Sequence, residues 1–209
     1  MCSGFIEQLI SLVAPPFCAA CAANRPVDSI LCERCGQELA TAPVILEFGP
    51  PGVDLAVPAS PFDGVARRVV RGLKYARRLA LARVAAVAML RALPPRESPQ
   101  AVVPVPPGPW RSRWRGFDPA DEIAIALSEL SGLPLVRCLR RGYGRRQVGR
   151  PRWERLSNPP RVWLAGGPPG SALLVDDVWT TGATLSACAL ALRADGSRRV
   201  VSLTLARTV

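Results

Sequence analysis

The sequence predicts an α/β protein in which helices flank a parallel sheet, with a small cysteine-rich unit at the N-terminal end. Short apolar runs alternate with stretches of helical periodicity, an order typical of strands joined by crossover helices. The chain has 209 residues and 49% of them are hydrophobic, enough to bury the core of one domain of ordinary size but not of two. Four closely spaced cysteines mark the additional unit.

Proline and glycine divide the chain. Residues 43–61 are rich in both, and they are predicted to link a unit of residues 1–42 to a main domain of residues 62–209. The opening MCSGFIEQLISLVAPPF has an apolar side but contains Glu7 and lacks a basic start and a cleavage site, so we expect a short amphipathic helix. No apolar run reaches the ~18 residues needed to span a bilayer, which favours a cytoplasmic protein.

The N-terminal unit is predicted to be a zinc knuckle. Cys18 and Cys21 form one pair and Cys32 and Cys35 a second, with ten residues between the pairs. This spacing suits one zinc ion held tetrahedrally by four thiolates. Because the chain contains no histidine, such a site would be closed and structural. Two disulfides, or a knuckle that has lost its metal, are the alternatives.

Missing residue types exclude several enzyme classes. Without histidine, the chain cannot form a Ser-His-Asp or Cys-His hydrolase site, or a histidine-based metal hydrolase site. Its only lysine, Lys74, lies in VVRGLKYARR, which is not the phosphate-binding loop that an NTPase requires. A strand that ends in two acids is therefore not the acidic strand of an NTPase in this chain.

The formal net charge of +11 indicates an anionic partner, either a nucleic acid or a phosphorylated metabolite. All but one of the 27 basic residues are arginine, and alanine, proline and glycine are abundant. Codon bias in a GC-rich genome would give the same composition, so the charge alone leaves both interpretations open.

The main domain begins with a helix and a strand. Asp63 and Gly64 open a helical stretch that continues through an alanine-rich run to Leu93, where PPRESPQ ends it. Residues 101–106 are then expected to form a short buried strand that prolines terminate.

The second half continues with a helix that has Asp118 as its N-cap, Pro119 at its first position and Gly132 after its end. Residues 133–140 are expected to be the next strand. Residues 140–160 form a long basic stretch, of a length that is usually functional or disordered in a compact domain. The last elements expected are a strand at residues 172–177, a helix at residues 182–196 and a strand at residues 198–207.

The stretch SALLVDDVWTTGATL combines two acids at the end of a strand with a hydroxyl-rich turn. Ligands of open parallel sheets bind at the carboxyl ends of the strands. The helix N-terminus after the turn can hold a phosphate, and Asp176 and Asp177 can accept hydrogen bonds from hydroxyls nearby. A ribose 5-phosphate offers both groups, so we interpret the stretch as a ribose-phosphate clamp; two acids that merely cap a helix are the alternative. The turn consists of Thr180, Thr181, Gly182, Ala183 and Thr184.

The segment LLVDDVWTTGATL resembles the signature of type I phosphoribosyltransferases, which bind phosphoribosyl pyrophosphate (PRPP). Nearly the whole chain resembles one branch of them, the ComF family, in its cysteine knuckle and in the segments LKY, VVPVP, RGF and RRQ, the last followed by Arg155 and Asn158. The chain departs from the family's pattern at Asp118 and Pro119, where Asn-Gln is common, and at Phe62, where tyrosine is usual. Both changes keep the local roles of capping and aromatic contact.

The resemblance implies a type I phosphoribosyltransferase-like fold and a site that binds PRPP or another ribose phosphate with Mg²⁺. Asp176 and Asp177 would be the catalytic residues, since they would position the sugar while pyrophosphate leaves. The other implied PRPP contacts are the Thr180 to Thr184 turn, Lys74, Arg115 and the loop that begins with Pro104, Val105 and Pro106. The residues also allow plainer interpretations: a solvated lysine, an arginine paired with a neighbouring acid, and prolines that only end a strand. The acceptor of the phosphoribosyl group is not indicated.

Members of the ComF family are associated with natural competence and incoming single-stranded DNA. The resemblance therefore implies a second hypothesis, a non-catalytic module that binds single-stranded DNA alongside competence-machinery proteins. Two segments interleave cations with aromatic rings, as single-strand binders do, although tryptophans near a cleft can also simply pack. The residues are Trp110, Arg111, Arg113, Trp114 and Arg115 in the first segment, and Tyr143 and Trp153 in the second.

Overall fold

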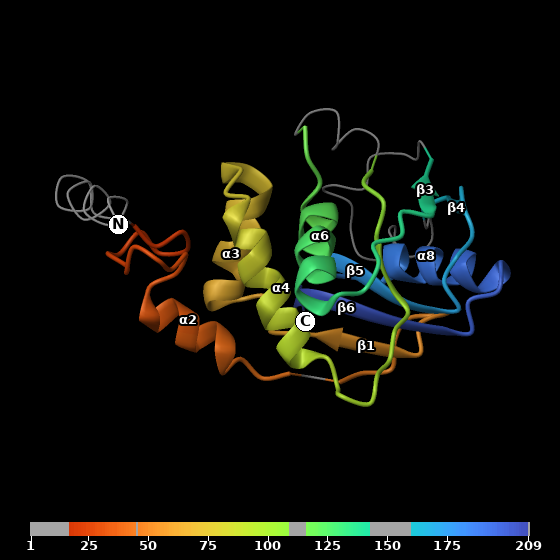
Figure 1. Cartoon of the computed structure of the whole chain (residues 1–209), viewed down its shortest axis with the longest axis horizontal. Helices are drawn as coiled ribbons and strands as arrows, with labels where there is room; N and C mark the ends of the chain where they lie inside the picture. The colour runs from red at the N-terminus through yellow and green to blue at the C-terminus, as the bar shows by residue number, and fades with distance from the viewer. Residues whose placement is uncertain (1–16, 45, 109–115, 143–159, 209) are drawn as a thin grey trace.

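The computed structural model describes residues 17–44, 46–108, 116–142 and 160–208 (Figure 1). Its centre is a sheet of four strands in the order β1-β6-β5-β2, all paired in parallel, so the expected parallel sheet is confirmed. The elements are α2 (Glu33–Ala40), β1 (Leu55–Pro58), α3 (Gly64–Ala76), α4 (Ala80–Ala92), β2 (Ala101–Pro104), α6 (Pro119–Ser131), β3 (Leu139–Arg141), β4 (Val162–Leu164), β5 (Ser171–Trp179), α8 (Ala183–Ala194) and β6 (Arg199–Arg207).

Alternating side chains give the sheet two apolar faces. Along β5, Leu173 and Val175 belong to a core cluster that also contains buried residues of α3, α4 and α6. Ala172 and Leu174 belong to a second cluster, which contains the buried residues of α8. Helices therefore cover both faces, which explains why the strands of the sheet are continuous apolar runs in the sequence.

Strand β1 lies inside the segment that the sequence predicts to be a linker. Leu55 stands opposite Val201 of β6, so this short strand forms one edge of the sheet. The proline and glycine around these four residues do not predict a strand, and only the pairing with β6 shows that one forms. The linker prediction is therefore wrong for residues 55–58.

The helical stretch predicted from Asp63 to Leu93 is two helices rather than one. Arg77, after the end of α3, adopts a left-handed conformation with φ of 51°, and α4 begins three residues later. The two helices approach closely, since a Cβ atom on Gly72 would lie 2.4 Å from Cδ1 of Leu81. The sequence has no glycine or proline at this break, so no local pattern predicts it. Packing between α3 and α4 decides its position.

Residues 133–140 do not form the predicted strand of the parallel sheet. The chain runs beside β2 for a single bridge, between Val102 and Leu135, and then diverges. Strand β3 begins at Leu139 and pairs antiparallel with β4 in a separate two-stranded sheet. By contrast, the helix predicted after Asp118 is confirmed as α6, and Gly132 ends it with φ of 73°.

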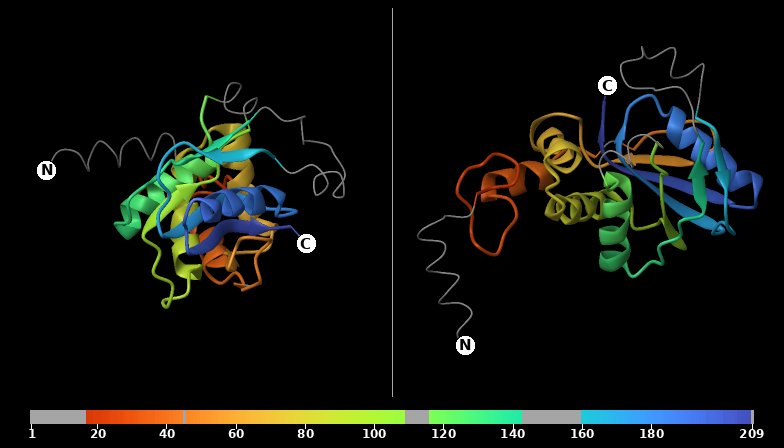
Figure 2. Two further views of the ribbon diagram at one scale, coloured as in Figure 1. Left: turned by 90° about the vertical axis from the view of Figure 1, so that its right-hand side faces the viewer. Right: turned by 90° about the horizontal axis from the view of Figure 1, so that it is seen from above.

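The cysteine-rich unit is docked on the main domain through α3. The carboxylate of Glu38 in α2 accepts a hydrogen bond of 2.7 Å from the N–H of Val65, in the first turn of α3. At the other end of α3, Nη1 of Arg78 donates to the carbonyl oxygen of Ala19 at 2.6 Å. Figures 1 and 2 show this unit beside α3, on the side away from α8. The unit thus shares the core of the main domain and is not tethered to it by a free linker.

The described part of the chain contains no helix that is both long and apolar enough to cross a membrane. The predicted N-terminal amphipathic helix falls within residues 1–16, which lie outside the described residues, as does the stretch 143–159.

Candidate functional site

Two acids near the carboxyl end of β5 form the centre of the site that the sequence predicts. Asp176 stands opposite Thr204 of β6, and β5 continues two residues beyond Asp177, to Trp179. Asp177 is only 7% exposed, whereas Asp176 is half-buried. Because successive side chains of a strand point to opposite faces, the two carboxyl groups have different surroundings.

Lys74 is brought to this site by the last turn of α3. Its Nζ lies 2.7 Å from Oδ2 of Asp177, with the two side chains 19% and 9% exposed. Breaking an ion pair that is shielded from water to this extent costs more free energy than breaking a surface pair. Lys74 is therefore not a solvated helix residue but the cationic partner of Asp177.

A third carboxyl group, that of Asp118, is added by the start of α6. Burial, and after it the charge of Asp177, raise the pKa of Asp118 to about 7. The side chain does not close a capping hydrogen bond on α6, although the nearby N–H of Ala120 offsets part of the rise. Its Oδ2 is buried without a hydrogen-bond partner among the described residues. The sequence analysis treats Asp118 only as a cap; its position directly after RGF, a segment of the family resemblance, is the one signal that could have marked it.

Burial also dominates at Asp176 and raises the pKa of its carboxyl group to about 8, with a further rise from Asp177 and an opposing effect from Lys74. Asp176 as a whole is half-buried, but its carboxyl group is enclosed, and this enclosure is what raises its pKa. Oδ1 accepts a 2.8 Å hydrogen bond from the N–H of Asp177. Proton-carrying carboxyl groups of this kind gather at functional sites more often than elsewhere.

The turn after β5 leads into α8 through a glycine that no other residue could replace without strain. Gly182 has φ of 79°, and a Cβ atom there would lie 3.0 Å from both Cβ of Pro50 and Nε1 of Trp179. Oγ1 of Thr181 accepts a long hydrogen bond of 3.4 Å from the N–H of Ala183. Thr180 is exposed and Thr184 is half-buried. The turn thus exposes hydroxyl groups at the positive end of the α8 dipole, as the clamp requires.

The loop that is expected to hold pyrophosphate offers few backbone donors. Pro104, Val105 and Pro106 are all buried, and the N–H of Val105 already donates to the carbonyl oxygen of Val175 at 2.9 Å. Proline has no N–H, so the first free donor of this loop is that of Gly108. Backbone atoms of residues 104–107 therefore cannot cradle a phosphate, and side chains would have to do so. Arg115, which the family resemblance implies as a PRPP contact, lies outside the described residues.

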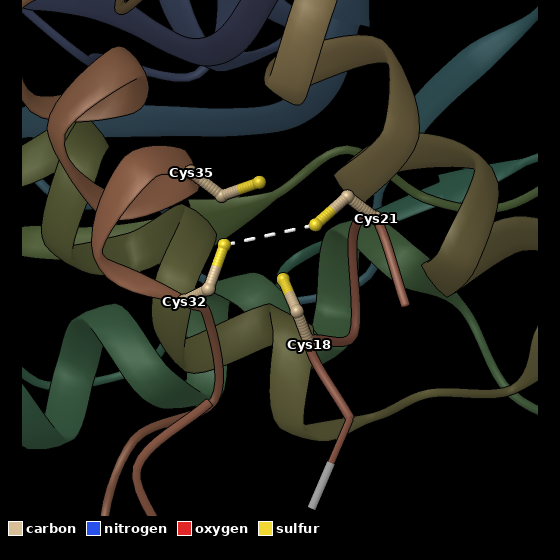
Figure 3. A group of neighbouring side chains, drawn as sticks. All are labelled: Cys18, Cys21, Cys32 and Cys35. Atoms are coloured by element: carbon tan, nitrogen blue, oxygen red, sulfur yellow. Dashed lines mark hydrogen bonds between the residues drawn. The ribbon is translucent and has the colours of Figure 1, made fainter. Parts of the chain in front are cut away.

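The four cysteines of the N-terminal unit converge at a second site. Figure 3 shows the side chains of Cys18, Cys21, Cys32 and Cys35 pointing toward a common centre, and their sulfur atoms all lie within 4.8 Å of one another. The Sγ atoms of Cys21 and Cys32 are 3.6 Å apart. A tetrahedral ion with metal–sulfur bonds of ~2.3 Å needs sulfur atoms ~3.8 Å apart. The cluster could therefore hold one metal ion.

The local backbone of the cluster suits thiolate ligands. The N–H of Ala20 donates to Sγ of Cys18 at 3.4 Å, and Ala22 turns the chain with φ of 62°. Burial would raise the pKa of Cys18, but backbone hydrogen bonds from Cys32, Cys21 and Ala20 outweigh it and lower the pKa to about 6. Burial raises the pKa of Cys35, and hydrogen bonds with the neighbouring thiols raise it further. A bound cation would favour the thiolate form of all four.

No protein-family model matches this chain, and a search of curated proteins finds no match either. The function is therefore argued from the two sites themselves.

Proposed function

We propose that this chain is a phosphoribosyltransferase-like protein of the ComF type, which binds PRPP or another ribose 5-phosphate with Mg²⁺ at the Asp176–Asp177 site. One observation carries the proposal: an acid pair near the carboxyl end of a central parallel strand is followed at once by the Gly182 turn and the N-terminus of α8. Acids beside a phosphate-binding helix end match the hydroxyl groups and the phosphate of one ligand.

Each group has a role in this proposal. Asp176 and Asp177 accept hydrogen bonds from the ribose hydroxyls, and the Thr180 to Thr184 turn receives the 5-phosphate at the helix end. Lys74, paired with Asp177 in the structure, turns to a phosphate oxygen of the ligand. Asp177 would then need another cation beside it, and Mg²⁺ bound together with PRPP would supply that charge.

The reaction proposed is transfer of the phosphoribosyl group to an acceptor. The bond between ribose C1 and pyrophosphate breaks, pyrophosphate leaves with the bonding electrons, and the acceptor's lone pair forms the new bond to C1. The protein has to stabilise the leaving group and exclude water, and it needs no histidine for either task. Since residues 104–107 offer no free N–H group, basic side chains are the proposed partners of pyrophosphate, Arg115 among them.

We also propose that the ion of the cysteine cluster is zinc. Four sulfur ligands with tetrahedral spacing and no histidine in the chain are typical of a closed structural zinc site. The disulfide alternative is weaker, because all four cysteines are free thiols in the structure and converge on one centre.

Calorimetry with PRPP and Mg²⁺ tests the proposed function. The double variant Asp176→Asn and Asp177→Asn should bind at least about tenfold more weakly, since it loses charge-assisted hydrogen bonds to the ligand. Asp195→Asn, an exposed position at the end of α8, is the matched control and should bind like the wild type. Because Asp177 is buried against Lys74, circular dichroism must first show that the double variant is folded. Unchanged affinity in a folded double variant would refute the clamp.

A second candidate function is binding of single-stranded DNA without catalysis. The net charge of +11 favours it, since summed positive charge attracts a polyanion. The segments predicted to contact the strand, residues 110–115 and 143–153, both lie outside the described residues.

A further inference from the structure

A hollow of about 580 Å³ lies beside the cysteine cluster, away from the acid–lysine site on β5. Residues 20–23 line it, together with Cys32 and Cys35 of the cluster. Three arginines complete its lining: Arg34 from the first turn of α2, Arg68 from α3 and Arg78 from the turn between α3 and α4. Separate elements thus bring three guanidinium groups to one concave surface, while no carboxylate of the described residues lines it.

The hydrogen-bond donors of these arginines are largely unused. Arg34 is exposed and has no ion pair or hydrogen bond with any part of the chain that the structure describes. Arg68 reaches Glu38 only at 3.5 Å, and its Nε is buried without a partner among the described residues. Arg78 is anchored by Nη1, which donates to Ala19. Each guanidinium has five N–H groups, so most of those that face the hollow are free to bind an acceptor.

We propose that this hollow is a phosphate-binding site, in which Arg34, Arg68 and Arg78 hold a phosphate group of a ligand. The planar fork of arginine matches phosphate oxygens in pairs. Docking of the cysteine unit on α3 builds the site, because Arg34 belongs to one side of that contact and Arg68 to the other. The phosphate could belong to a small metabolite or to the backbone of a nucleic acid.

Calorimetry on the zinc-loaded protein measures phosphate binding without using the reactivity of the cysteines. Pyrophosphate and a short oligothymidine are the two probes. Binding of pyrophosphate alone indicates a small metabolite, and tighter binding of the oligonucleotide, weakened by salt, indicates a nucleic acid. The part of the affinity that depends on Arg34 belongs to the hollow and not to the Asp176–Asp177 site, so this test can fail while the proposed function stands, and the reverse.

Arg34→Gln is the decisive variant, because Arg34 is exposed and makes no hydrogen bond or ion pair with the described residues that folding would lose. The Kd of the probe should rise about tenfold, the loss expected for one charge-assisted contact. Arg83→Gln, which removes an exposed charge from α4 outside the hollow, should leave it unchanged. The proposal is overturned if neither probe binds, if Arg34→Gln and Arg83→Gln weaken binding equally, or if Arg34→Gln only releases the metal, since the arginines would then serve the thiolates alone.

Discussion

At the scale of single residues, the acid–lysine site is defined by groups whose surroundings conflict with their charge. Three carboxyl groups and one ammonium group share a largely buried place, so all three acids cannot be ionised there without cost. The raised pKa values of Asp118 and Asp176 express this conflict. A proton bound to Asp118 or Asp176 would lower the cost of burying these charges, and so would a cation that binds together with a ligand.

Asp118 should make stability depend on pH. Its pKa is about 7 in the folded protein, above the ordinary value of 3.8, so the folded state holds the proton where the unfolded chain has lost it. Stability from this group is complete at low pH and is lost as the pH rises from about 4 through about 7. Asp118→Asn keeps the capping residue type and removes the titration. Between pH 5.5 and 8.5, the free energy of urea unfolding of the wild type should fall by about 2 kcal/mol more than that of the variant. Equal losses would contradict the burial of this carboxyl group.

Gly182 should be needed for two separable reasons, its backbone conformation and its crowding. Gly182→Ala should lower the free energy of unfolding by about 1–2 kcal/mol for the left-handed backbone, and further for contact with Pro50 and Trp179. Gly132 has nearly the same conformation, with φ of 73°, but open space around it. Gly132→Ala should therefore cost the first part alone, measured by the same urea unfolding. If the two variants are equally destabilised, the close approach at Gly182 is not real.

At the scale of elements, the cysteine unit and α3 stabilise each other. Glu38 caps the start of α3 from another element, and Cys18, Cys35 and Leu39 pack in the same core cluster as Val65. Burying these groups links the cysteine site to the stability of the main domain.

Loss of the metal should therefore destabilise the main domain as well as the cysteine unit. Metal analysis of the purified protein should give about one zinc per chain. Cys21→Ser should lose the zinc and lower the thermal midpoint, since binding free energy is folding free energy in such sites. Cys138→Ser removes a buried thiol far along the chain from the cluster and should keep the zinc. A stable wild-type protein that contains no zinc and has reactive thiols would refute this assignment.

At the scale of the whole molecule, the open question is whether a net charge of +11 has a polyanionic partner or only reflects the arginine bias of the sequence. Counterion release makes a true polyanion site steeply dependent on salt, while base stacking makes it dependent on particular aromatic rings. The two causes are separable by experiment.

Single-stranded DNA binding should weaken steeply with salt in a fluorescence-anisotropy titration, and Trp114→Ala and Trp153→Ala should each cost about 1–3 kcal/mol of binding free energy if those rings stack on bases. Double-stranded DNA of the same length is the control. Equal binding by the wild type and both variants, with no preference for single strands, would leave the phosphoribosyl function as the surviving proposal.

The sequence alone determined β2, α6, β5, α8 and β6, the turn from Asp176 to Thr184 and the grouping of four cysteines, because each rests on residues adjacent or nearly adjacent in the chain. Tertiary structure decided what depends on distant segments. It added β1 to the sheet, broke the long helix at Arg77, and joined Lys74 and Asp118 to Asp177. Burial and ion pairing arise only when α3, α6 and β5 meet, so no local pattern encodes them.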